Sequence, residues 1–85
     1  MKKFNYTITE ELGLHARPAG LLVKEVKKLD SEVTITFNDS TVSCGKLMAL
    51  MGLGVACSDT VTVTIEGGNE DSSYETIRNF FESNL

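Results

Sequence analysis

Three segments of the chain alternate apolar and polar residues with a period of two, which is the pattern of a strand with one buried face. They cover residues 4–9, 32–37 and 60–66. Asn38-Asp39 follows the second segment and predicts a tight turn into a short strand at 40–43. Because threonine occupies most of the polar positions, we expect a threonine-rich sheet face that looks into solvent.

Two other segments have the helical period. Residues 16–29 are predicted to form a helix with one apolar stripe, made of Ala19, Leu22, Val23 and Val26. Asn69 is a good N-cap for a final helix whose core face is expected to contain Tyr74, Ile77 and Phe81, with Phe80 beside it. Between them, residues 47–55 fit one or two helical turns but carry more apolar residues than one buried face can absorb.

The predicted order is therefore β-α-β-β-α-β-α. With 85 residues, three layers would each have too little core, so the helices are expected on one face of one sheet. The predicted fold class is α+β: an open-faced β-sandwich with a four-stranded antiparallel sheet and three helices, in a single domain covering residues 1–85. A functional site should then lie on the surface.

Charge and composition narrow the classes of partner. A net charge of −4 argues against nucleic acid, because a duplex needs a cationic footprint. No apolar run is long enough to span a bilayer and no leader pattern follows Met1, so we expect no membrane insertion and a cytoplasmic protein. Cys44 and Cys57 are then expected to be free, semi-buried thiols, and their spacing from His15 lacks a metal-site pattern.

The segment Gly13-Leu-His-Ala-Arg-Pro-Ala-Gly20 holds the only histidine and the only proline, where the strand period gives way to the helical one. If the helix begins directly after His15, proline is tolerated in its first turn, where amides have no intrahelical acceptor. The backbone amides of Ala16 and Arg17 would then point toward an anion beside the ring, and the Arg17 guanidinium suits phosphoryl oxygens. The sequence thus predicts a phosphate site.

The positive pole of the helix should also favour a neutral, nucleophilic imidazole. No nearby carboxylate is an obvious base, and no metal, cofactor or phosphate-loop motif is present. We therefore expect a carrier that accepts a phosphoryl group on His15, and not an enzyme.

This segment, the order of elements and the chain length resemble the HPr family, the histidine-containing phosphocarriers of the bacterial sugar phosphotransferase system. The resemblance implies that Enzyme I, using phosphoenolpyruvate, phosphorylates Nδ1 of His15, and that Enzyme IIA domains of sugar transporters receive the group. It also implies a docking surface on the first and second helices. That surface would contain Ala16, Arg17, Gly20, Leu21, Lys24, Lys27, Leu47, Met48, Met51 and Leu53.

One position departs from some members of the family. In HPr proteins of low-GC Gram-positive bacteria a serine just before the second helix is the target of a regulatory kinase, whereas this chain has Lys46 there. Since lysine is no substrate for a serine kinase, and Ser43 falls in the predicted hairpin strand, we expect that signalling role to be absent or altered.

Plainer interpretations remain open. A lone histidine at a helix start is usually a cap or a surface residue, and about half of residues 47–55 could be ordinary core. A second functional class is a regulatory binding module, in which phosphorylation of His15 changes affinity for a target in a nitrogen-related or dihydroxyacetone-kinase branch. Nothing in the sequence requires more than a monomer.

Overall fold

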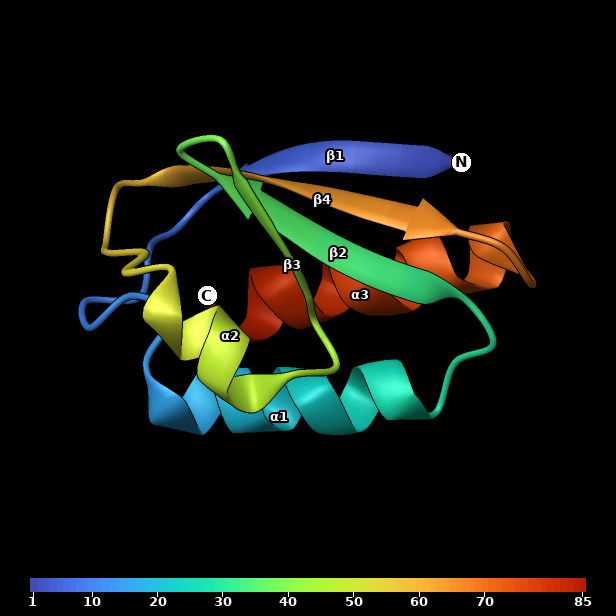
Figure 1. Ribbon diagram of the computed structural model, residues 1–85, viewed down its shortest axis with the longest axis horizontal. Helices are drawn as coiled ribbons and strands as arrows, with labels where there is room; N and C mark the ends of the chain where they lie inside the picture. Colours follow the sequence, from blue (N-terminus) through green and yellow to red (C-terminus); the bar gives the residue numbers. More distant parts are fainter.

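The computed structural model describes residues 1–85 and has the predicted order of elements (Figure 1). They are β1 Lys2–Thr7, α1 Ala16–Lys27, β2 Glu32–Phe37, β3 Ser40–Ser43, α2 Leu47–Gly52, β4 Thr60–Glu66 and α3 Glu70–Asn84. The first strand ends before Ile8, although Ile8 is buried and continues the alternation. Because Ile8 is buried like the inward residues of β1, the period-two pattern in the sequence continues past the end of that strand.

The four strands form one antiparallel sheet in the order β1-β4-β2-β3. β2 and β3 are joined by the expected tight turn, in which Asn38 and Asp39 have φ angles of 49° and 66°. Two successive residues with positive φ are typical of a type I′ turn, which fits the right-handed twist of paired strands. β4 is the last strand in the chain, but it lies at the centre of the sheet between β1 and β2.

All three helices lie on one face of the sheet (Figure 1). The inward positions of the central strands are fully buried, with Ile35 and Val63 at 0% exposure. The outward positions carry threonines, and Thr7–Thr60 and Thr36–Thr41 form hydroxyl hydrogen bonds of 2.8 Å across neighbouring strands. The α+β open-faced sandwich and its threonine face are therefore confirmed. No helix combines the length and apolar character needed to cross a membrane.

Both long helices bury one stripe each. In α1 the buried residues are Pro18, Ala19, Leu22 and Val26. In α3 they are Ser73, Ile77, Phe80 and Phe81, whereas Tyr74 is only half-buried. Asn69 caps α3 as predicted, since its side chain accepts a hydrogen bond from the Ser72 amide.

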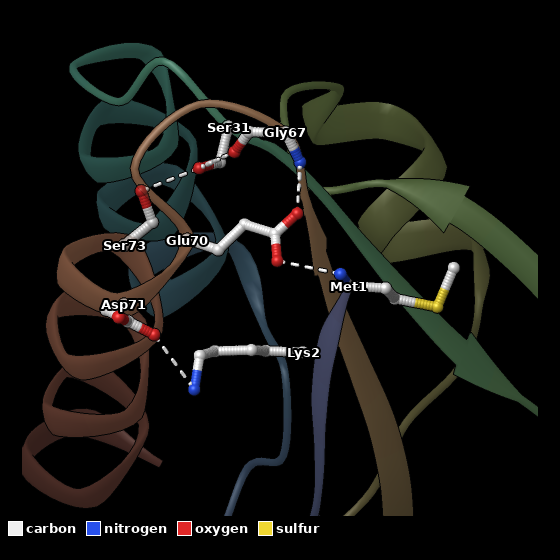
Figure 2. A network of polar contacts seen from close by, with 7 residues as sticks. All are labelled: Met1, Lys2, Ser31, Gly67, Glu70, Asp71 and Ser73. Carbon is white, nitrogen blue, oxygen red and sulfur yellow. Dashed lines mark hydrogen bonds and ion pairs between the residues drawn. The ribbon is translucent and has the colours of Figure 1, made fainter.

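Figure 2 shows a polar network that joins the start of β1 to the start of α3. The Met1 ammonium lies 2.7 Å from Oε1 of Glu70, and the Gly67 amide donates to Oε2 of the same carboxylate at 2.7 Å. Beside it, Lys2 pairs with Asp71 at 2.9 Å. These contacts fix β1 and the β4–α3 turn to the first turn of α3, where acidic side chains also complement the helix dipole.

The same network gives stability a pH dependence. The N-terminal ammonium, followed by the Gly67 amide, lowers the pKa of Glu70 from 4.5. A group with a lowered folded pKa contributes stability above its unfolded pKa and loses it as pH falls through the folded value. We expect Glu70→Gln to lack this pH-dependent contribution to stability. Its unfolding free energy should therefore decline less than that of the wild type between about pH 6 and pH 3. Denaturant titrations at several pH values measure it.

Glu75→Gln is the matched control, because Glu75 is exposed on the same helix and forms no ion pair. It should keep the wild-type decline in stability at low pH. Equal slopes for both variants would mean that the Glu70 contacts do not operate in solution.

Candidate functional site

His15 is the N-cap of α1, as predicted. Its backbone is extended (φ −89°, ψ −178°), and its carbonyl accepts the first helical hydrogen bond, from the Ala19 amide at 3.0 Å. The imidazole makes no capping hydrogen bond, so both ring nitrogens are free of a structural role at the helix end. The side chain of His15 therefore does not cap the helix, and the plainer interpretation of His15 as a surface residue stays open.

The amides of the first turn of α1 are unpaired. No hydrogen bond within the chain uses the amide hydrogens of Ala16 or Arg17, and Pro18 has none to offer. Both residues are exposed, whereas Pro18 is buried against the core. A helix start with free amides attracts negative charge, because the dipole places roughly half a positive charge there.

A hollow of about 340 Å³ lies beside the imidazole and opens to solvent. It is lined by the turn before α1, the first turns of α1 and the end of α3, through Glu10, His15, Arg17, Pro18, Leu21, Ser83 and Asn84. The His15 side chain is 32% exposed, so the ring is reachable from outside. The imidazole and the guanidinium therefore share one surface depression large enough for a phosphoryl group.

The loop that carries His15 is tied to the segment before β4. The Leu14 amide donates to the Val55 carbonyl at 3.0 Å, and the Leu14 side chain is buried. Gly13 has a φ of +69°, and a Cβ there would overlap the Val55 carbonyl and lie 2.7 Å from Cα of Ala56. Glycine is needed at this position both for its backbone angle and for the close approach.

The sequence indicated no nearby carboxylate that would be an obvious base, but the structure places one beside His15. Oε1 of Glu10 is 4.0 Å from Nε2 of His15. The turn from Glu10 to Gly13, closed by a 2.9 Å hydrogen bond from the Gly13 amide to the Glu10 carbonyl, brings the two side chains together. Sequence reasoning missed Glu10 because its place depends on this turn, and residues outside a regular element carry no periodic signal.

The expected docking residues lie on α1 and α2, which pack against each other, and Leu53 follows directly after α2. Leu21, Leu47 and Met51 are 43%, 38% and 39% exposed, and Met48 is 79% exposed. Ala16, Arg17, Lys24 and Lys27 are also exposed, whereas Gly20 and Leu53 are half-buried. Leu50 is fully buried, so α2 divides its apolar residues between the core and the surface.

Leu12 is a further exposed apolar residue, and the sequence pattern did not reveal it. It is 71% exposed and lies in the turn that holds Glu10. A short loop has no periodicity by which an outward leucine could have been recognised.

The departure at position 46 lies at the start of α2. Lys46 is its N-cap and is exposed. The nearest serine upstream, Ser43, is half-buried at the end of β3, and its Oγ accepts the Gly45 amide at 3.1 Å. The Ser43 hydroxyl therefore has a structural partner.

The two cysteines are free, as predicted, but neither is semi-buried. Cys44 is fully buried, and burial raises the pKa of its thiol to about 12. Cys57 is exposed, with its Sγ 3.8 Å from the Thr9 carbonyl. The residues next to the two cysteines in the sequence did not show that the Cys44 thiol lies in the core and the Cys57 thiol at the surface.

No group of three or more His, Cys, Asp or Glu side chains is arranged to hold a metal ion.

Comparison with known proteins decides the family. The family model described as "PTS HPr component phosphorylation site" matches residues 2–83. The chain belongs to the PTS HPr family. It is 33% identical over 78 residues to the phosphocarrier protein HPr of Mycoplasma capricolum subsp. capricolum, covering 92% of this chain and 88% of the relative.

Solved HPr structures share the fold. The crystal structure of HPr-C-His from Thermoanaerobacter tengcongensis is similar with a TM-score of 0.91 and 31% identity, over 98% of this chain and 93% of that one. An HPr dimer from the same organism gives a TM-score of 0.76 at 31% identity, over 98% and 95% of the two chains. One of these relatives is a dimer, so the expected monomer stays a prediction for this HPr-family chain.

Proposed function

We propose that His15 of this HPr-family chain accepts a phosphoryl group from Enzyme I, charged by phosphoenolpyruvate, and passes it to Enzyme IIA domains of sugar transporters. Residues 1–85 would act as a single domain and as a monomer in the cytoplasm. The chain would be a carrier and not an enzyme, because each group it accepts must leave to another protein before the next can be bound.

The observation that carries this proposal is the partly exposed imidazole at a helix start with unpaired amides. Its lone pair at Nδ1 attacks phosphorus, the bond from phosphorus to the donor breaks, and the electron pair of that bond stays with the donor. The amides of Ala16 and Arg17 and the Arg17 guanidinium supply hydrogen-bond donors for the phosphoryl oxygens during transfer.

The exposed apolar residues of α1 and α2 support docking beside this site. Two of them, Met48 and Met51, are methionines, whose flexible side chains adapt to different surfaces. Lys24 and Lys27 are exposed on α1, on a chain that is acidic overall. Acidic partner surfaces would be attracted to them, with more effect on association rate than on affinity.

Labelling and discharge test the proposal. The protein is incubated with Enzyme I and radiolabelled phosphoenolpyruvate, and purified Enzyme IIA domains are then added. A carrier takes one acid-labile phosphoryl group and loses it rapidly to at least one of these domains. A label that stays on the chain while a separate target binds more tightly would instead support the regulatory module, and no label at all would contradict both.

Arg17 should matter for transfer and little for folding. We expect Arg17→Ala to slow both loading and discharge by roughly ten- to a hundredfold, because the phosphoryl oxygens lose their cationic donor. Arg17→Lys keeps the charge without the planar fork of donors, so its rates should lie between those of the wild type and Arg17→Ala. Rapid-quench kinetics give the rates, and unfolding in denaturant shows whether the fold is intact. Wild-type rates in Arg17→Ala would remove Arg17 from the site.

A further inference from the structure

We infer that Glu10 is a positioning residue for phosphoryl transfer. Its carboxylate keeps the imidazole proton on Nε2 of His15. This inference rests on the proposed function of His15, which it extends to the far side of the ring. The Glu10 carboxylate faces Nε2 and leaves Nδ1 as the nitrogen with the free lone pair.

Glu10 is held by two backbone hydrogen bonds and by one hydrogen bond to its carboxylate. The Glu10 amide donates to the Leu85 carbonyl at 2.8 Å, and the Glu10 carbonyl accepts from Gly13 at 2.9 Å. Its Oε1, the same atom that lies 4.0 Å from Nε2 of His15, also accepts the Leu12 amide at 3.4 Å. The side chains of Glu10 and His15 are 37% and 32% exposed. A carboxylate in this setting is anchored and only partly screened by water.

The chemistry follows from the two nitrogens of a neutral imidazole, of which one donates and the other accepts. An ionised carboxylate only accepts, so a carboxylate beside Nε2 favours the tautomer with hydrogen on that nitrogen. At 4.0 Å the contact is one of charge and not a hydrogen bond. Its effect is on the balance between tautomers and on the charge of the ring.

Both directions of transfer then proceed without moving a proton. When Nδ1 forms its bond to phosphorus, the ring keeps its hydrogen on Nε2 and becomes cationic. Glu10 and Arg17 are the charged groups that line the hollow. The carboxylate offsets the positive charge of the ring, whereas the guanidinium meets the phosphoryl oxygens. On discharge a nucleophile of the accepting domain forms a bond to phosphorus, the bond from phosphorus to Nδ1 breaks, and its electron pair returns to Nδ1.

A cationic phosphoimidazole releases its phosphoryl group more readily than a neutral one. Removal of the Glu10 charge should therefore slow discharge, and the deficit should shrink in acid, where Nε2 holds its proton unaided. A charge at this distance in partly exposed surroundings corresponds to about a three- to fivefold change in rate. A purely structural role for Glu10 would not make the deficit depend on pH.

The test compares Glu10→Gln with Glu11→Gln, an adjacent exposed glutamate that does not line the His15 hollow. Full-length proteins with ¹⁵N-labelled histidine are examined by NMR at several pH values, and discharge to an Enzyme IIA domain is timed across the same pH range. In Glu10→Gln we expect the two ring nitrogen shifts to move toward a tautomer mixture, and discharge to slow as described. Glu11→Gln should behave as wild type.

Unchanged nitrogen shifts or unchanged discharge in Glu10→Gln would overturn the inference, while leaving His15 as the acceptor. A wild-type protein that takes no phosphoryl group would overturn the proposed function instead, and the shifts of the unphosphorylated ring would still decide the tautomer. Glu10→Asp retains a shorter charged group and should give intermediate shifts, which guards against a folding defect in the glutamine variant.

Discussion

Alanine in place of His15 is expected to abolish phosphorylation by Enzyme I completely. The chain has no other histidine, and the hollow beside α1 would keep its amides and guanidinium but lack an imidazole to accept the phosphoryl group. The fold should survive, because the imidazole is 32% exposed and makes no capping hydrogen bond. We expect a loss of less than about 1 kcal/mol in unfolding free energy. Intact mass and acid-labile label measure the first effect, and denaturant unfolding measures the second.

Ser72→Ala is a suitable control, because Ser72 is exposed at the far start of α3 and contributes only its amide to the Asn69 cap. It should be labelled like the wild type. If His15→Ala still took up an acid-labile phosphoryl group, another residue would be the acceptor and the proposed function would fall.

Removal of the Phe81 ring is expected to cause the largest loss of stability. Phe81 is fully buried, and its ring packs edge-on against Phe4, Tyr6 and Phe80 at centroid distances of 5.6, 5.4 and 6.2 Å. Phe81→Ala would leave a cavity between α3 and β1 at a cost of about 3 to 5 kcal/mol. A domain of this size has only about 5 to 10 kcal/mol in total. Urea titrations should show a much lower midpoint.

Phe37→Ala gives the matched comparison. Phe37 is half-buried at the end of β2, beside the hairpin, so its loss should cost only about 1 to 2 kcal/mol. Similar losses at the two positions would mean that the aromatic cluster around Phe81 adds nothing beyond ordinary burial.

Most of the elements could be predicted because they have a local period. Alternation marked β2 and β4, and the three- and four-residue spacing marked α1 and α3. The sheet order β1-β4-β2-β3 was not read from the sequence, because alternation shows which face of a strand is buried and not which strand it joins. The place of β4 between β1 and β2 is set by tertiary packing.

The site could be predicted as far as it is local. His15, Arg17 and Pro18 are close together in the chain, and the change of period placed them at a helix start. Glu10 and Asn84 could not be assigned, because a turn and the end of α3 bring them to the same hollow. Contacts of this kind depend on the path of the backbone between regular elements, for which the residue types give little guidance.

The single open hollow beside His15 determines how donor and acceptor proteins can bind to the carrier. Since the partly exposed ring is reached through this one hollow, a donor and an acceptor would approach from the same side and need the same apolar and basic residues of α1 and α2. The donor and the acceptor would therefore compete for one binding site, so a complex of this chain with both of them could not form. Flux would depend on how fast each partner departs.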